Sequence, residues 1–322
     1  MAIKSFRDFM KEAVQAYYSS ERALRDFFTS PELDRAFGEA LAEFLAQYLR
    51  EFEKPVLVEL GAGRGILARD ILSYLERNYP EIFNSLTYYI YEFSPYLIEK
   101  QRKLLGDFKN VFWVLELPKV EGVIFSNEFF DALPVHVVRE GRELYVKDNE
   151  SLVWLSLENE RVKEFLERMG YEGLNQVLEV GLDALDFLKK VSESLKEGYH
   201  LVIDYGYTSE EITRFPEGTI VAYKEHKVIQ SLEEIVKLAG SVDITAHVNF
   251  SSLMEYGRDY GLEPILFQNQ REFLLHVPTF LNELERLSWE ETPESIERLS
   301  RLKTMLISMG DRFKVLLQRK VS

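Results

Sequence analysis

The chain has 322 residues and contains no cysteine. It therefore cannot form disulfides, bind zinc through thiolates or use a thiol as a nucleophile. It also lacks an uninterrupted apolar run of the roughly 18 residues that a membrane-spanning helix needs. The N-terminal residues show no apolar signal core and carry acids too early for a transit peptide. We therefore expect a soluble cytoplasmic protein without membrane insertion.

Positive charge is also scarce, because 39 Lys and Arg stand against 54 Asp and Glu and the formal net charge is −15. Such a chain repels phosphate over most of its surface, which argues against nucleic acid as a partner. A cationic partner fits the charge better. There is no G-x-S-x-G nucleophile elbow and no Walker loop. The histidines have no metal-ligand spacing on one helix, so no metal site is indicated. They are His136, His200, His226, His247 and His276.

After residue 55, apolar strands alternate with amphipathic helices. This alternation predicts an α/β fold with a doubly wound, mostly parallel Rossmann-like sheet. The strands are expected at 56–60, 86–93, 111–115, 122–126 and 201–206, with a closing pair at 265–267 and 273–277. Helices are expected at 66–77, 95–105, 182–195 and 251–260, with Gly198 ending the third of them.

This pattern divides the chain into three segments. Residues 1–54 are expected to form a helical N-terminal arm, and residues 55–277 the α/β core. Within the core, three strands joined by tight turns predict an antiparallel insertion at about 135–180. Residues 278–322 are expected to be a helical tail packed on the core, whose amphipathic helices could cover the sheet or form a homodimer surface. The arm should contain helices over 6–28 and 31–52.

A glycine turn follows the first core strand. Gly61, Gly63 and Gly65 come directly after the apolar run 56–60 and precede a helix. Glycine lets the backbone turn tightly and approach a ligand, and the helix start offers free N–H groups. The spacing is G-x-G-x-G, whereas dinucleotide-binding folds use G-x-G-x-x-G.

Two acids indicate which nucleotide fits this turn. Glu59 lies two residues before the first glycine, and Glu92 ends the next strand, beyond the usual dinucleotide spacing. S-adenosylmethionine has no pyrophosphate but carries a sulfonium, an ammonium and a ribose diol. An acid at the turn suits the cationic end, and an acid after the second strand can accept both ribose hydroxyls. The pattern predicts an S-adenosylmethionine site.

Each of these acids also has a structural alternative. Glu59 could be a strand-end acid held by backbone amides, and Glu92 could cap the following helix. Glu116, after the third strand, could reach the adenine amino group or be a solvated loop acid.

A second polar group follows the fourth strand. Asn127, Glu128 and Asp131 lie where open α/β sheets place their active sites. They could orient a guanidinium, a planar cation that pairs bidentately with carboxylates, for attack on a methyl group. The alternative is a capped turn with Asn127 as the N-cap. His247, in a short polar cluster with Asp243, could line the pocket or be a structural histidine.

Several segments resemble the MidA family of S-adenosylmethionine-dependent methyltransferases, which includes the mitochondrial complex I assembly methyltransferase. They occur in family order over nearly the whole chain, at 26–32, 37–39, 59–65, 127–134, 203–206, 243–250, 309–310 and 313–316. The Asn-Glu-Phe-Phe-Asp run at 127–131 is the most specific of them. Two departures are modest: Ala62 stands where the family often has proline, and residues 19–25 differ from a segment that is often rich in glycine and tyrosine.

The resemblance implies a seven-stranded sheet with an antiparallel final strand. It also implies methylation of a protein arginine, to symmetric dimethylarginine, on a subunit of respiratory complex I or its bacterial counterpart. Asp204, Tyr205 and His247 would then bind the substrate. Two other hypotheses stay open: a methyltransferase for another cationic or small acceptor, and a non-catalytic assembly factor that binds S-adenosylmethionine.

Overall fold

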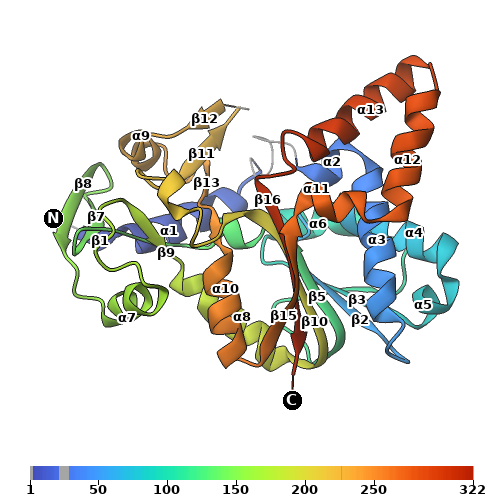
Figure 1. The fold of residues 1–322 in the computed structure, drawn as a ribbon, viewed down its shortest axis with the longest axis horizontal. Helices are drawn as coiled ribbons and strands as arrows, with labels where there is room; N and C mark the ends of the chain where they lie inside the picture. The colour runs from blue at the N-terminus through green and yellow to red at the C-terminus, as the bar shows by residue number, and fades with distance from the viewer. Residues whose placement is uncertain (1–2, 22–28, 226, 322) are drawn as a thin grey trace. The chain divides into compact units, whose positions relative to one another are not determined.

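The computed structural model describes residues 3–21, 29–225 and 227–321. The chain divides into two compact units (Figure 1). The sheet unit comprises residues 28–127, 190–204 and 258–322, and the insertion unit comprises residues 1–27, 128–189 and 205–257. The expected arm, core and tail stay a prediction. Residues 22–28, which include part of the predicted first helix and of the first MidA-like segment, lie outside the described residues, as does His226.

The sheet unit is built on a mixed sheet with the strand order β15-β16-β10-β5-β2-β3-β4 (Figure 1). The strands are β2 Val56–Leu60, β3 Thr87–Tyr91, β4 Val111–Val114, β5 Val120–Asn127, β10 Leu195–Tyr207, β15 Leu262–Asn269 and β16 Phe313–Lys320. The strands from β10 to β4 pair in parallel, and β15 pairs with β16 in antiparallel fashion. The predicted seven-stranded, mostly parallel sheet with an antiparallel end is confirmed.

Close backbone approach explains two glycines at the centre of this sheet. Gly122 in β5 pairs with Gly198 in β10 and with Val56 in β2. A Cβ atom on Gly122 would lie 2.0 Å from the Val56 carbonyl oxygen. The interpretation of Gly198 as a helix terminator is wrong, because the helix α8 (Leu182–Ser194) ends earlier and Gly198 lies within β10.

The helices of the sheet unit are α2 Ser30–Leu33, α3 Arg35–Leu49, α4 Ile66–Asn78, α5 Pro80–Ser85, α6 Pro95–Leu105, α11 Gln270–Leu275, α12 Pro278–Trp289 and α13 Pro293–Leu306. The single helix expected over 31–52 is interrupted at Asp34, which is extended with φ −158° and ψ 144°. The Asp34 carboxylate accepts the N–H of Ala36 at 3.0 Å and so caps α3. Among residues 3–21, 29–225 and 227–321, no helix is long and apolar enough to cross a bilayer.

Two expectations for the C-terminal part are wrong. Residues 273–277 do not form a strand, because Asn269 and Glu272 form a capping box that starts α11. The tail is not helical to its end, because residues 313–320 form β16 between β10 and β15. Pairing with strands far away in sequence outweighs the local helical pattern there.

The insertion unit contains two small sheets. The first has the order β1-β7-β6-β9, with β8 paired to β7, and the second has the order β12-β11-β13. The strands are β1 Ile3–Ser5, β6 His136–Arg139, β7 Arg142–Lys147, β8 Ser151–Ser156, β9 Leu178–Val180, β11 Val221–Lys224, β12 Lys227–Ile229 and β13 Asp243–Thr245. A short strand, β14 (Val248–Asn249), pairs with the last residues of β10. The three predicted antiparallel strands after residue 134 are confirmed.

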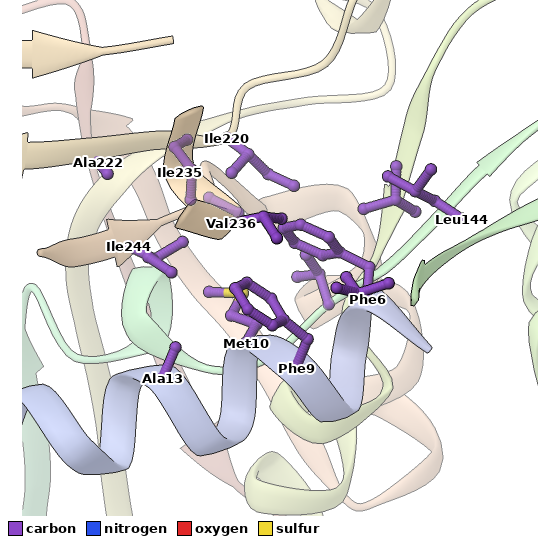
Figure 2. Packing of buried hydrophobic residues seen from close by; sticks show 14 of the residues in the cluster. Phe6, Phe9, Met10, Ala13, Leu144, Ile220, Ala222, Ile235, Val236 and Ile244 are labelled. Atoms are coloured by element: carbon purple, nitrogen blue, oxygen red, sulfur yellow. The ribbon is translucent and has the colours of Figure 1, made fainter. Parts of the chain in front are cut away.

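The helices of this unit are α1 Phe6–Tyr18, α7 Glu160–Met169, α8, α9 Leu232–Lys237 and α10 Phe250–Asp259. The helix α1 ends ten residues before the expected boundary at 28. It buries Phe6, Phe9, Met10 and Ala13 on one face, at the spacing of an amphipathic helix. Figure 2 shows these side chains pointing toward Leu144 of β7 and toward residues on β11, α9 and β13. This core fixes α1 and thereby the position of Tyr18 at its C-terminal end.

Candidate active site

The glycine turn joins β2 to α4 in the sheet unit. Gly61, Gly63 and Gly65 have φ values of +66°, +54° and +85°. Residues other than glycine rarely adopt this left-handed backbone conformation. The N–H of Gly61 donates to the Tyr91 carbonyl at 3.0 Å, which ties the turn to β3. Glycine is therefore favoured at all three predicted positions, and the start of α4 has N–H groups that a ligand can meet.

Glu59 lies at the end of β2, directly before this turn. It is 2% exposed, and its Oε2 accepts a hydrogen bond of 2.6 Å from the Tyr88 hydroxyl. Burial raises the pKa of Glu59 to about 7, although the Tyr88 hydrogen bond lowers it, and the charge of Glu92 adds to the increase. A carboxylate with so little water around it gains stability from a nearby cation. Glu59 is thus suited to the cationic end of S-adenosylmethionine.

Glu92 follows β3 and is held by three hydrogen bonds. Its Oε1 accepts the N–H groups of Phe93 at 2.9 Å and Ser94 at 3.1 Å, and its Oε2 accepts from Gln101 Nε2 at 3.3 Å. Burial raises its pKa despite these bonds. Glu92 therefore orders the backbone ahead of α6 without capping that helix, whose N-cap is Ser94, and this role is compatible with holding a ribose diol.

Gln101 on α6 forms hydrogen bonds to both Glu92 and the glycine turn. It is fully buried, and its Nε2 also donates to the Gly63 carbonyl at 2.7 Å. Its Oε1 accepts from Trp113 Nε1 at 2.9 Å. The sequence reasoning missed Gln101, Trp113 and Tyr88. One signal was available, because Gln101 interrupts the buried series Leu97, Gln101, Leu105 with a polar side chain.

Two of the remaining predicted residues of the sheet unit, Asn127 and Asp204, lie near the carboxyl ends of neighbouring parallel strands. Asn127 ends β5 and pairs with Ile203 of β10, so Asp204 lies one residue beyond that pair, fully buried. Because these strands are parallel, Glu59, Asn127 and Asp204 all lie toward their carboxyl ends. Glu116, in contrast, is exposed two residues after β4, and its contact with adenine stays a prediction.

Glu128 begins the next part of the chain, in the insertion unit. Its backbone has φ +55°, a conformation that is uncommon for residues other than glycine. Strained backbone of this kind is concentrated at functional sites, where the surroundings hold it in place. Glu140, in the turn between β6 and β7, has a similar φ of +50°, so this conformation fits the capped-turn alternative as well as a role in the site.

Carboxylates and tyrosines gather around Asp131 in the insertion unit. Asp131 is 5% exposed, and burial raises its pKa to about 7, while its own N–H and that of Ala132 lower it. The Asp131 carbonyl accepts the N–H of Ala246 at 2.9 Å, which joins this turn to β13. Burial also raises the pKa of Tyr223, with further contributions from the charges of Asp131, Glu128 and Asp243. These three acids therefore lie within electrostatic reach of one tyrosine.

Tyr18, at the end of α1, belongs to the same group. Its hydroxyl donates to Asp243 Oδ2 at 3.2 Å. Burial raises the pKa of Tyr18, and the charges of Asp243 and Asp131 add to this effect. Sequence reasoning missed Tyr18 and Tyr223, because their shared neighbours come from parts of the chain more than 100 residues apart.

His247 and Tyr205 provide flat aromatic surfaces in this unit. Their rings are stacked with centroids 6.0 Å apart and planes 10° from parallel, and Phe215 meets His247 edge-on at 5.3 Å. The His247 N–H donates to the Thr219 hydroxyl at 2.9 Å. Tyr205 is hydrogen-bonded to Tyr223. The structure therefore brings the predicted pair Tyr205 and His247 together and connects it to the acids.

Two solved structures from Burkholderia thailandensis are similar to the chain over almost its whole length. One is bound to S-adenosyl-homocysteine and matches with a TM-score of 0.82 and 26% identity, covering 98% of this chain and 88% of the other. A second, native structure matches with a TM-score of 0.84 and 27% identity, covering 98% and 87%. S-adenosyl-homocysteine is the product that remains when S-adenosylmethionine has given up its methyl group.

Curated relatives are also similar to the chain over most of its length. The Drosophila melanogaster homologue of protein arginine methyltransferase NDUFAF7 is 26% identical, covering 90% of this chain and 74% of its own. The Homo sapiens protein arginine methyltransferase NDUFAF7 is 27% identical, covering 95% and 78%. The model of a family of S-adenosyl-L-methionine-dependent methyltransferases matches residues 37–268. S-adenosyl-L-methionine is thus the cofactor, and the chain belongs to the MidA family of methyltransferases that use it.

Proposed function

We propose that this methyltransferase transfers its methyl group to a guanidinium nitrogen of an arginine in a protein substrate. The observation that carries the proposal is the group of three carboxylates, Glu128, Asp131 and Asp243, around Tyr223 in the insertion unit. A neutral or anionic acceptor would gain nothing from this much negative charge. A cation would offset it.

The shape of the guanidinium supports arginine among the possible cations. It is planar and presents five N–H donors, which match the acceptor-only oxygens of ionised carboxylates. Its flat face also stacks on aromatic rings, and the stacked rings of Tyr205 and His247 belong to the same group. A lysine ammonium would use the charge but not the planar surfaces.

The acids also provide for the proton that arginine must lose. Bound S-adenosylmethionine supplies a methyl group on a sulfonium. As a guanidinium nitrogen gains that methyl group, the nitrogen gives up one proton. A general base works best when its pKa is near the operating pH, and the raised pKa of Asp131, about 7, meets this condition. We assign Glu128 and Asn127 to orienting the guanidinium and Asp131 to accepting the proton.

The relatives support a protein as the acceptor. Those from Drosophila melanogaster and Homo sapiens are named protein arginine methyltransferases, at 26% and 27% identity. The net charge of −15 also favours a basic substrate surface. Together with the resemblance to the complex I assembly methyltransferase, this leads us to propose a subunit of respiratory complex I, or its bacterial counterpart, as the substrate.

Labelling with methyl-tritiated S-adenosylmethionine tests the proposal. The purified protein is incubated with an extract from cells that lack it, and the labelled proteins are hydrolysed. We expect label on arginine, and mass spectrometry should identify symmetric dimethylarginine. Label confined to small molecules or RNA would contradict a protein-arginine substrate.

Variants of Glu128 and Tyr223 test the assigned site. Glu128→Gln should lower transfer by about a hundredfold or more, an effect in the range of general acid–base and electrostatic contributions, while binding of S-adenosyl-homocysteine stays unchanged. Glu140→Gln is a matched control, because Glu140 also has positive φ, at +50°, but is exposed. Tyr223→Leu should raise KM for the protein acceptor about tenfold, as a loss of about 1.4 kcal/mol, and Tyr223→Phe should raise it less. Unchanged turnover in Glu128→Gln would remove Glu128 from the mechanism.

A further inference from the structure

The glycine turn carries an arginine, Arg64, whose side chain forms an ion pair with the helix α2 in the sheet unit. Arg64 lies between Gly63 and Gly65, and its Nη1 is 3.3 Å from Glu32 Oε1 at α2. We infer that this ion pair, the Glu32–Arg64 clasp, holds α2 against the glycine turn and makes α2 a wall of the S-adenosylmethionine site. The inference does not depend on arginine as the methyl acceptor.

Glu32 is held in place before it meets Arg64. Its Oε2 accepts the N–H of Thr29 at 3.2 Å, as part of a capping box with Thr29. Its side chain is 10% exposed, against 41% for Arg64. An exposed ion pair usually contributes little, because two long side chains must be ordered in water. Here one partner is already ordered and mostly shielded from water, so the pair can position the backbone that carries it.

The clasp is one of the attachments that hold a very short helix in place. The helix α2 has only four residues, Ser30–Leu33, and a helix of one turn has no stability of its own. At its C-terminal end, Asp34 accepts two hydrogen bonds from the buried Arg298 of α13, at 2.8 and 2.9 Å. At its N-terminal end, the fully buried Ser30 has its Oγ 3.7 Å from Met309 Sδ.

These attachments have different consequences for a ligand. The bonds between Asp34 and Arg298 and the contact between Ser30 and Met309 attach α2 to α13 and to the residues that follow α13. Glu32, in contrast, connects α2 to the turn that approaches the ligand. Losing the clasp should therefore loosen the site at the glycine turn, where we expect the amino-acid end of the cofactor. The ribose end near Glu92 should be unaffected.

Calorimetry with two ligands tests this inference on the full chain. S-adenosyl-homocysteine has the amino-acid end, and adenosine lacks it. Arg64→Met and Glu32→Gln should each weaken binding of S-adenosyl-homocysteine about tenfold and change adenosine binding by less than about twofold. Arg64→Lys keeps a cation beside Glu32 and leaves the capping box intact, so it should retain more of the affinity than Arg64→Met.

Arg77→Met is the matched control. Arg77 lies on α4, which follows the turn, and its Nη2 is 3.2 Å from Glu39 Oε1 on α3, so this ion pair also joins two elements of the sheet unit. Its loss should leave both ligands unaffected. Equal loss of S-adenosyl-homocysteine in Arg64→Met and Arg77→Met, or equal loss of both ligands in Arg64→Met, would overturn the inference. Melting temperatures identify a variant that fails to fold, and Arg64→Met, which leaves the capping box intact, then decides the result.

Discussion

Tyr88 donates its hydroxyl hydrogen to Glu59 across 2.6 Å, and both side chains are buried in the sheet unit. The two residues come from neighbouring parallel strands, β3 and β2. Burial outweighs this hydrogen bond, so the pKa of Glu59 rises to about 7. The protein therefore keeps a carboxyl that is easily protonated beside the glycine turn, where a cationic ligand would favour its ionised form.

Glu59 should make the ligand-free protein less stable as the pH rises. The pKa of an ordinary glutamate is 4.5 and that of Glu59 in the folded state is about 7, so the folded protein binds this proton more tightly. The resulting stability is fully present below pH 4.5 and is lost as the pH rises through 7. Glu59→Gln keeps an acceptor for Tyr88 and should increase the free energy of unfolding at pH 8 by up to about 3 kcal/mol.

Urea unfolding at pH 5 and pH 8 without ligand measures this effect. The variant should exceed the wild type by less than about 1 kcal/mol at pH 5 and by up to about 3 kcal/mol at pH 8. Glu99→Gln, at an exposed position of α6, is the control and should behave as the wild type at both values. An equal difference at both pH values would show that Glu59 is not the titrating group. We also expect Glu59→Gln to bind S-adenosylmethionine less tightly, since it cannot carry the negative charge.

Gln101→Leu should damage the cofactor site without changing the fold. Leucine fills a similar volume but cannot donate to the Gly63 carbonyl or to Glu92, and cannot accept from Trp113. Losing partners for buried polar groups costs about 1–3 kcal/mol for each group. We expect weaker binding of S-adenosyl-homocysteine by about tenfold or more, measured by calorimetry, and a lower melting temperature. Wild-type affinity with only a lower melting temperature would limit Gln101 to a structural role.

Gly122→Ala should be much more damaging than Gly141→Ala. Both glycines have positive φ, +150° and +72°. A Cβ on Gly122 would lie 2.0 Å from the Val56 carbonyl oxygen, whereas a Cβ on Gly141 would have no atom within 4 Å. Gly141→Ala should therefore show only the backbone strain, about 1–2 kcal/mol. Gly122→Ala must also separate strands β5 and β2, and we expect a loss above about 4 kcal/mol or no folded protein. Thermal unfolding of the two variants makes the comparison, and similar melting temperatures would contradict it.

Elements with strong local signals were predicted correctly. The strand β2, the three glycines and α4 follow one another within 23 residues, and each depends on its own sequence: an apolar run, positive φ and helical spacing. The helix α6 begins after Ser94, whose hydroxyl caps it, as the Ser-Pro pair predicts. Such features form wherever the local chain favours them, so they can be recognised without knowing what packs around them.

Elements that depend on distant partners were missed or misassigned. The strand β16 lies between β10 and β15, which are separated from it by more than 40 residues, and its own sequence fits a helix as well as a strand. Asp34 interrupts a helical pattern because its carboxylate is needed both by the N–H of Ala36 and by the buried Arg298. Neither requirement can be recognised from the residues next to Asp34.

The sequence by itself determined the fold class, the cofactor and the acids that were expected to meet it. The glycine spacing and the positions of Glu59 and Glu92 relative to their strands are local properties, and chemistry selects the ligand that suits them. Only the tertiary structure decided which side chains support the site: Tyr88 bonds to Glu59, Gln101 bonds to Glu92 and to Gly63, and Glu32 pairs with Arg64. It likewise gathered Tyr18, Tyr223 and three carboxylates in one unit. The reason is physical, since hydrogen bonds and charge interactions act over a few ångströms in space, and packing alone brings residues far apart in the chain within that range.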